Sequence, residues 1–262
     1  MEVTLDRSEF FTLAALMRAK DIIGLAPEQL LPPTPSERQQ FYDQGEASLR
    51  QRDLLRINPK KEAVLEADLL AMTKAVVDPD NALVVVRTTP AVGKQLFLFY
   101  EKDGQFVEQT LPTERSHRLA QIGGQADTLE RLLAIFPVES KSSGTDSFTI
   151  DQASLFRMYA LVNEHKRGEA EAVLKEAQTT NQALTTELLN AVETGRFNGT
   201  IALLKCRPDQ DNDVGEIAIV QGQTSAWCIT QAADDPAGAH VEPINADGFR
   251  AMLGAALEEL GR

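Results

Sequence analysis

The amino-acid sequence predicts an α+β fold made of two tandem copies of one unit, in which helices precede a strand meander and a closing helix. The copies are expected to be related by pseudo-twofold symmetry around an antiparallel sheet. The first observation is that "EVTLDRSEFFTLAALM" (2–17) aligns without gaps to "SFTIDQASLFRMYALV" (147–162). The second is that further similarities follow in the same order, which an accidental likeness between two amphipathic helices does not explain.

These further similarities extend the repeat through both halves of the chain. They pair 68–87 with 187–206, 92–100 with 214–222, 117–122 with 240–244, and 128–136 with 248–256. We therefore expect a first α+β repeat at 1–137, a polar linker at 138–146 and a second repeat at 147–262, together forming one compact domain. Extra residues around "LAPEQLLPPTPSERQQ" make the first copy the longer one.

Capping residues and turn residues mark the elements of the first repeat. Asp6 precedes an amphipathic pattern and stands three residues before Glu9, the spacing of a capping box. Thr34-Pro35-Ser36-Glu37 opens a second helix in the same way. In this repeat we expect helices at 7–19, 60–77 and 126–136 and a further helix that begins at residue 35. The expected strands are 82–88, 94–101, 105–110 and 117–122. The "KDGQ" stretch is expected to be a hairpin turn.

The second repeat follows the same pattern of apolar periodicity. We expect helices at 151–165, 167–178, 182–194 and 246–260, and strands at 199–207, 215–221, 225–231 and 240–244. One further segment, "QRDLLRIN" (51–58), lies between expected helices and gives the outline of a winged-helix start.

The strand "QLFLFY" (95–100) is apolar on both faces, which predicts that both faces are covered. Helices on the two sides of a central strand would cover it, and a bound partner would do so as well. If a partner surface exists, this strand and the loop "TTPAVG" (88–93) are the expected places. The candidate partner-binding residues are Thr88, Val92, Phe97 and Phe99.

Composition excludes several classes of partner. The formal net charge is −13, with 39 acidic against 26 basic residues, so neither nucleic acid nor an anionic membrane is an expected partner. No apolar run is long enough to span a bilayer, and the acidic N-terminus does not resemble a signal peptide. We expect a cytoplasmic protein whose charge favours solubility.

No motif predicts catalysis, a metal or a cofactor, and no catalytic residue is assigned. "TTPAVGKQL" (88–96) has Thr88 where a phosphate loop needs glycine, and it leads into a strand. The histidines and the two cysteines lack metal-ligand spacing, and the cysteines are expected to be free thiols. His117 and His240 fall at equivalent points of the aligned repeats, which indicates a structural role.

The capped opening helix, the "EASLRQRDLLRINPKKEAVLEADLLAMTKAVVDPDNALVVVR" segment and the meander after it together resemble the EspG family of type VII secretion chaperones. The residues that carry the resemblance are Asp6, Glu9, Leu54, Leu55, Leu69, Leu70 and Pro79. The resemblance implies a quasi-twofold α+β fold and an acidic cytosolic protein that keeps a secretion substrate soluble. It also implies a substrate surface that involves the central sheet and a loop between early strands.

The sequence therefore predicts a non-enzymatic, protein-binding chaperone or adaptor, whose partner is a protein such as a helical secreted substrate. The alternative is a small-molecule sensor or binding domain with a pocket between the two halves. The oligomeric state stays open.

Overall fold

The computed structural model describes residues 1–19, 21–26, 31–60, 62–113, 115–140, 146–177, 182–206 and 213–261. The chain divides into two compact units. Unit 1 contains Met1–Val84, Leu96–Thr128 and Leu203–Asp213, and unit 2 contains Val85–Gln95, Leu129–Ala202 and Val214–Arg262. Part of the expected linker, 141–145, lies outside the described residues.

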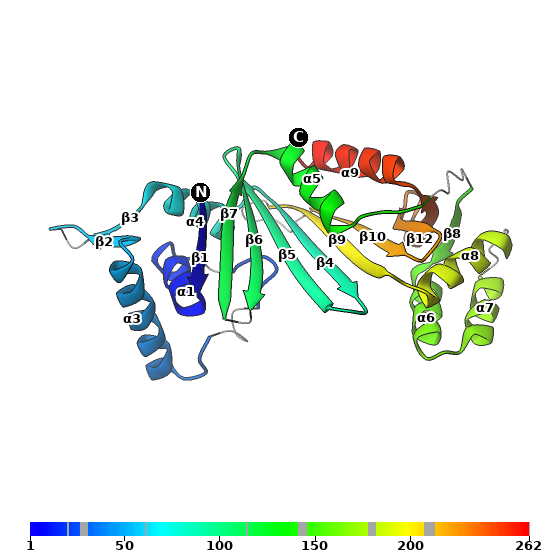
Figure 1. Ribbon diagram of the computed structural model, residues 1–262, viewed down its shortest axis with the longest axis horizontal. Coiled ribbons are helices and arrows are strands. Elements are labelled where there is room, and N and C mark those ends of the chain that lie inside the picture. Colours follow the sequence, from blue (N-terminus) through cyan, green and yellow to red (C-terminus); the bar gives the residue numbers. More distant parts are fainter. Residues whose placement is uncertain are drawn as a thin grey trace. The chain divides into compact units, whose positions relative to one another are not determined.

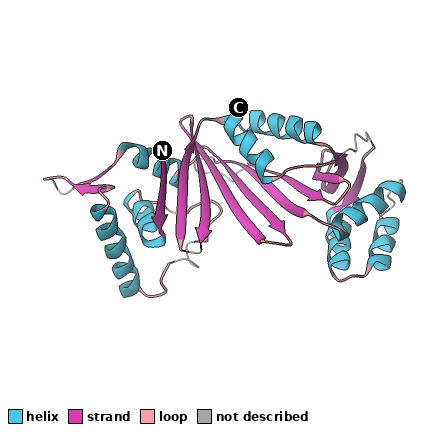
Figure 2. Cartoon of the chain, viewed as in Figure 1, coloured by secondary structure: helices cyan, strands magenta, loops and turns pink. Residues whose placement is uncertain are grey.

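The fold is α+β, as the sequence predicts, with a large antiparallel sheet (Figures 1 and 2). The ten strands of this sheet follow the order β1-β7-β6-β5-β4-β9-β10-β11-β12-β8. Pairing is antiparallel for β1–β7, β5–β6, β6–β7, β10–β11, β11–β12 and β12–β8. None of the helices in the described ranges combines the length and the apolar character needed to cross a membrane.

The first part of the chain forms seven strands and three helices in the described ranges. They are β1 (Glu2–Asp6), α1 (Arg7–Leu16), α3 (Pro35–Gln51), β2 (Leu55–Ile57), β3 (Ala63–Leu65), α4 (Ala67–Val77), β4 (Asn81–Thr89), β5 (Gly93–Lys102), β6 (Gln105–Thr113) and β7 (Ser116–Ile122). In unit 1 the helices α1, α3 and α4 bury one sheet face, with Leu13, Leu49, Leu69, Leu98 and Leu119 each 0% exposed.

The second part forms five strands and five helices in the described ranges. They are α5 (Gln125–Ile135), β8 (Phe148–Asp151), α6 (Gln152–Asn163), α7 (Arg167–Glu176), α8 (Gln182–Glu193), β9 (Phe197–Lys205), β10 (Asp213–Gln221), β11 (Ala226–Ala232), β12 (Asp235–Ile244) and α9 (Ala246–Leu260).

Helices cover both faces of the strands in unit 2. The bundle of α6, α7 and α8, seen together in Figure 1, packs against the face that carries Trp227 and Ile229. Helix α9 covers the other face, where the Cys228 thiol meets the sulfur of Met252 at 3.2 Å. Since neighbouring residues of a strand point to opposite faces, β11 is apolar on both sides.

The opening strands β1 and β8 are absent from the sequence-based prediction, which begins each repeat with a helix. Both are short and alternate in burial: Val3 and Leu5 are buried in β1, and Phe148 and Ile150 in β8. Each pairs with the last strand of its own unit, β1 with β7 and β8 with β12. The pairing joins segments far apart in sequence, so local propensity does not reveal it.

A second difference concerns the expected helix at 60–77, because helical structure begins only at Ala67. Residues before it form the β2–β3 hairpin. The Asn58 side chain accepts hydrogen bonds from the backbone N–H groups of Lys60 and Glu62, both at 2.9 Å, and thereby holds the hairpin turn. The helix–helix–helix outline of a winged helix is therefore wrong.

Turn and capping predictions are confirmed where they depend on adjacent residues. Asp103 and Gly104 lie in the "KDGQ" turn with φ of 51° and 76°, as a tight hairpin requires. Both Asp6 with Glu9 and Thr34 with Glu37 form complete capping boxes.

The two units share one strand order, since β1-β7-β6-β5-β4 corresponds to β8-β12-β11-β10-β9. The register corrects the sequence alignment at the histidines. His117 lies opposite Leu5, while His240 lies opposite Thr149, whose aligned partner is Thr4. The two histidines are therefore one position apart and point to opposite faces. The pseudo-twofold relation between the units stays a prediction.

Candidate functional site

Unit 2 contains a groove of about 700 Å³ between helix α6 and the sheet, here called the trough. Its lining comes from α6 and from strands β4, β9, β10, β11 and β12. The lining includes Thr88, Phe156, Tyr159, Gly199, Glu216 and Ala218.

The helical wall of the trough is aromatic. Helix α6 begins after Asp151, whose carboxylate accepts a hydrogen bond from the Ser154 N–H at 2.8 Å. One turn later Phe156 points away from the buried face of the helix and is 70% exposed. Burial raises the pKa of the Tyr159 phenol, so its hydroxyl stays protonated at neutral pH. An aromatic ring left in water at the edge of a groove is a typical contact for an apolar partner.

The sheet wall combines small and polar side chains with branched aliphatic ones such as Ile219 and Ile229. Gly199 on β9 lies so close to β4 that an added Cβ would stand 2.2 Å from the Val86 carbonyl oxygen. Thr88 and Ala218 continue this wall, and Glu216 is the one charged residue among the described residues that line the trough. The arrangement offers apolar contact, hydroxyl and amide groups, and a single carboxylate.

The predicted partner-binding residues are distributed over both units. Thr88 lines the trough and Val92, in the turn between β4 and β5, is 68% exposed; both belong to unit 2. Phe97 and Phe99 belong to unit 1, where Phe97 is half-buried and Phe99 is only 3% exposed. Phe99 therefore contributes to the core in this structure, and "QLFLFY" is buried on both faces, at Leu98 and at Phe99.

Phe156, Tyr159, Glu216 and Ala218 are trough residues that the sequence analysis does not single out. A signal for Phe156 exists, because it lies outside the helical spacing of Leu155, Met158, Tyr159 and Val162. The trough itself has no sequence signal, since its walls come from strands and a helix that are distant along the chain.

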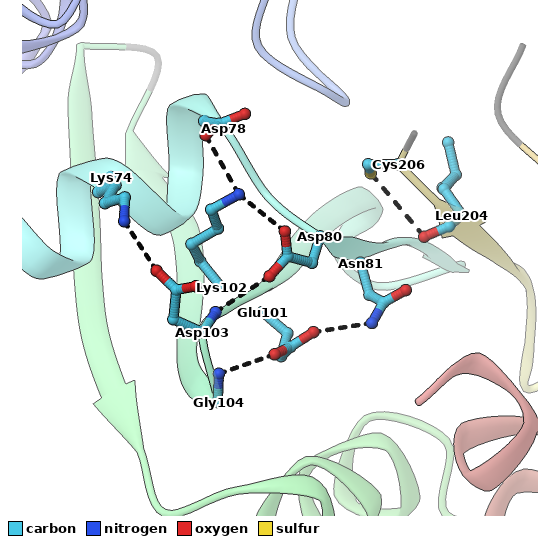
Figure 3. Close-up of polar contacts among 10 residues, drawn as sticks. All are labelled: Lys74, Asp78, Asp80, Asn81, Glu101, Lys102, Asp103, Gly104, Leu204 and Cys206. Atoms are coloured by element: carbon cyan, nitrogen blue, oxygen red, sulfur yellow. Dashed lines mark hydrogen bonds and ion pairs between the residues drawn. The ribbon is translucent and has the colours of Figure 1, made fainter. Parts of the chain in front are cut away.

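A second cluster of charged groups lies in unit 1 at the β5–β6 turn (Figure 3). Lys102 Nζ contacts the carboxylates of Asp80 at 2.7 Å and Asp78 at 3.2 Å, and Lys74 contacts Asp103 at 2.7 Å. The Lys102 ammonium lowers the pKa of the Asp80 carboxyl. These ion pairs connect the end of α4 to the strand hairpin, which is a structural role.

The two cysteines show no sign of activation. Burial, with the Asp80 carboxylate close by, raises the pKa of the Cys206 thiol to about 11, and burial raises that of Cys228 to about 12. Both are free thiols in the structure. A thiol that stays protonated is a poor nucleophile and a poor metal ligand. Within the described ranges, no three metal-ligating side chains gather.

Comparisons with known proteins identify a fold. No family model matches the chain, and no curated protein matches it. Among solved structures, the Mycobacterium tuberculosis type VII secretion system chaperone EspG5, in complex with the PE25–PPE41 dimer, is similar with a TM-score of 0.68. The likeness covers 98% of this chain and 96% of that chain at 12% sequence identity. The EspG-like fold that the sequence predicts is therefore confirmed.

Proposed function

We propose that this chain is a protein-binding chaperone or adaptor, and that the trough of unit 2 holds an apolar segment of its client. The observation that carries the proposal is Phe156, a large aromatic side chain 70% exposed on the wall of a groove. Burying such a ring against a client stabilises the complex by about 1.5–3 kcal/mol. We further propose that the client is a helical secreted protein and that the chain acts in the cytoplasm without catalysing a reaction.

The fold and the charge support this function. The structurally similar EspG5 is itself a secretion chaperone solved with a protein dimer bound. A net charge of −13 gives the free chain and its complex mutual repulsion between copies, which opposes aggregation around an exposed apolar site.

Thr88 and Val92 extend the proposed client surface within unit 2. Thr88 lines the trough, and the exposed Val92 lies in the turn that joins β4 to β5. Phe97, on β5, stays a separate proposal that Phe97→Asp tests, with circular dichroism as the check on folding. Phe99 is proposed to support the strand from inside the core.

A small molecule is the second candidate occupant. The volume of the trough, about 700 Å³, falls within the range typical of ligand pockets. The rival hypothesis from the sequence placed such a pocket between the halves, whereas the trough lies within unit 2.

The decisive experiment compares three variants in affinity purification from the native host. Phe156→Asp should lose the client and keep the wild-type circular dichroism spectrum, because the new carboxylate remains in water. Leu16→Asp is the matched control: Leu16 is 43% exposed in unit 1, and this variant should keep the client. Phe99→Asp should unfold, because it buries an unpaired carboxylate.

Retention of the same protein client by Phe156→Asp at wild-type yield would contradict the proposed site. If Phe156→Asp instead loses affinity for a small molecule seen by native mass spectrometry, while no protein depends on it, the second candidate is correct.

A further inference from the structure

Unit 1 covers with its own chain a surface that unit 2 leaves open in the trough. The register identifies corresponding positions. In unit 1, Leu98 on β5 faces Gln109, which faces Leu119. In unit 2, Ala218 on β10 faces Ile229, which faces Val241. Leu119 and Val241 occupy equivalent places, opposite β1 and β8, so Leu98 corresponds to Ala218. The sequence alignment, which pairs Leu98 with Val220, is therefore wrong here by two residues.

The cover in unit 1 comes from residues 21–26, between α1 and α3. Tyr100 Oη donates a hydrogen bond to the Ile23 carbonyl at 2.9 Å, and Ile22 is 4% exposed. Gly24 has φ of 78°, and a Cβ there would stand 2.3 Å from the Leu98 side chain. Only glycine combines that backbone conformation with so close an approach. Leu98 is 0% exposed beneath this segment.

Unit 2 has no corresponding segment in the described part of the chain. Helix α6 ends at Asn163 and α7 begins at Arg167, so residues 164–166 are the whole connection. The face that Leu98 occupies in unit 1 is therefore represented by Ala218 on the trough wall. Two residues earlier on the same strand, the exposed Glu216 stands at the position that corresponds to Leu96.

The aromatic wall shows the same contrast. Phe11 on α1 aligns with Phe156 on α6, yet Phe11 is 3% exposed and Phe156 is 70% exposed. The Phe11 ring lies 6.5 Å from the ring of Phe41 on α3 and 6.0 Å from that of His117. Phe41, which directly follows the extra residues of the first repeat, thus helps to cover Phe11.

We infer that the client places a short, irregular apolar segment in the trough, where it does what residues 21–26 do in unit 1. This segment has branched aliphatic side chains followed by a glycine that crosses β10 at Ala218. This inference rests on the proposed function and specifies its client. Alanine in place of leucine leaves room for a client side chain, and Phe156 takes the place of the covered Phe11.

Glu216 adds a requirement of charge. It has no ion pair within the described residues, and it occupies a position that is apolar in unit 1. A client segment that approaches β10 brings this carboxylate out of water, so a segment with a net positive charge is favoured and one with a net negative charge is rejected. Glu216 is therefore the proposed specificity residue.

The test uses a fluorescent peptide with the sequence of residues 17–26, "MRAKDIIGLA", and the full-length protein. Fluorescence anisotropy should show binding, with at least a tenfold loss for Ala218→Trp, which fills the trough. Ala255→Trp, an identical substitution at an exposed position of α9, is the control and should bind as the wild type does. Circular dichroism checks that both variants fold.

Two further measurements separate the parts of the inference. A peptide with aspartate at both isoleucine positions should fail to bind. Glu216→Gln should weaken binding of the basic peptide several-fold and reduce its dependence on salt. Equal binding by Ala218→Trp and the wild type would overturn the inference, because the peptide would then bind elsewhere. An absence of binding by the wild-type protein would also overturn it.

The results also distinguish a failure of the inferred segment from a failure of the proposed function. If Phe156→Asp loses the native client but the peptide neither binds nor competes, the trough is a client site and the inferred segment is wrong. If both the client and the peptide are indifferent to substitutions in the trough, both proposals fail.

Discussion

At the residue scale, His117 shows how burial determines the state of a titratable group. The residue is 1% exposed, and its ring stacks on Phe10 with centroids 4.0 Å apart. The Gln109 amide nitrogen, which can only donate, donates a hydrogen bond to His117 Nδ1 at 2.8 Å. That nitrogen must be unprotonated, and the imidazole is neutral. Burial, and secondarily the charge of Arg7, lowers the pKa of His117 to about 4.

The lowered pKa predicts a loss of stability in acid. Between pH 6.5 and about 4 the unfolded chain binds a proton at His117 and the folded chain does not, so the free energy of unfolding falls as pH falls. The full loss is on the order of 3 kcal/mol. Urea denaturation at several pH values should show that His117→Gln removes this slope while His240→Gln, at a partly exposed histidine, retains it. Identical slopes in all three proteins would refute the prediction.

Buried apolar residues of the two aligned helices supply a second residue-scale prediction. Leu13 on α1 and Met158 on α6 are both 0% exposed. Leu13→Ala and Met158→Ala should each lower the free energy of unfolding by about 2–5 kcal/mol, because each leaves a cavity. Leu16→Ala, at a 43% exposed position, is the control and should change it little. A denaturant midpoint unchanged by the two core substitutions would mean that another helix face is buried.

At the element scale, Glu9 connects three elements through one carboxylate. Its oxygens accept hydrogen bonds from the Asp6 N–H at 2.8 Å, Ser48 Oγ at 2.7 Å and Arg52 Nη1 at 2.6 Å. The same side chain that completes the cap of α1 therefore also fixes α3 beside it. The aligned position in the second repeat is Ser154, so α6 keeps the cap but lacks this connection.

Two glycines allow an element-scale test with opposite signs. Gly104→Ala should destabilise the β5–β6 hairpin by about 1 kcal/mol, because φ there is 76° and an L side chain is strained at that angle. Gly254→Ala in helix α9 should stabilise by about 0.5–1 kcal/mol, because an added Cβ meets nothing within 4 Å and alanine favours the helix. Thermal melts of both variants measure the effects. Shifts of equal sign would contradict this account of the two backbone positions.

At the scale of the whole molecule, both units have the same strand order and differ in the segments that pack against the strands. The opening strand pairs with the last strand in each, and the meander then runs back in order. The extra segment after α1 distinguishes unit 1, and the trough distinguishes unit 2. The two units thus differ on the sheet face beside α1 and α6.

We predict that an experimental structure will show residues 1–137 and 147–262 superposing element by element through a rotation near 180°. The shared strand order and the gapless alignment of their opening helices support this. A crystal structure measures it directly, with β2 and β3, which have no counterpart in the described part of the second half, left out of the superposition. Halves that superpose only by translation, or only over the opening helix, would end the repeat hypothesis.

Local signals in the sequence were sufficient for most helices and strands and for the fold class. Capping boxes at Asp6 and Thr34, the glycine of the hairpin at 103–104 and the apolar periodicity of α9 each depend on neighbouring residues, and the sequence alone predicts them. The helix expected at 60–66 is wrong. Local apolar spacing favoured a helix there, but the Asn58 side chain accepts a hydrogen bond from the Glu62 N–H and these residues form a hairpin.

Tertiary structure alone decided the register, the burial and the site. The one-residue offset between His117 and His240 follows from their pairing with strands that are distant in the sequence. The pairs β1–β7 and β8–β12 likewise join segments that are far apart along the chain. The sequence by itself determined the α+β class and the capped helices, and it predicts two related halves. Whether Phe99 is covered, whether Phe156 is open and where a trough lies depend on which distant segments pack over each face, because burial is a property of three-dimensional neighbours.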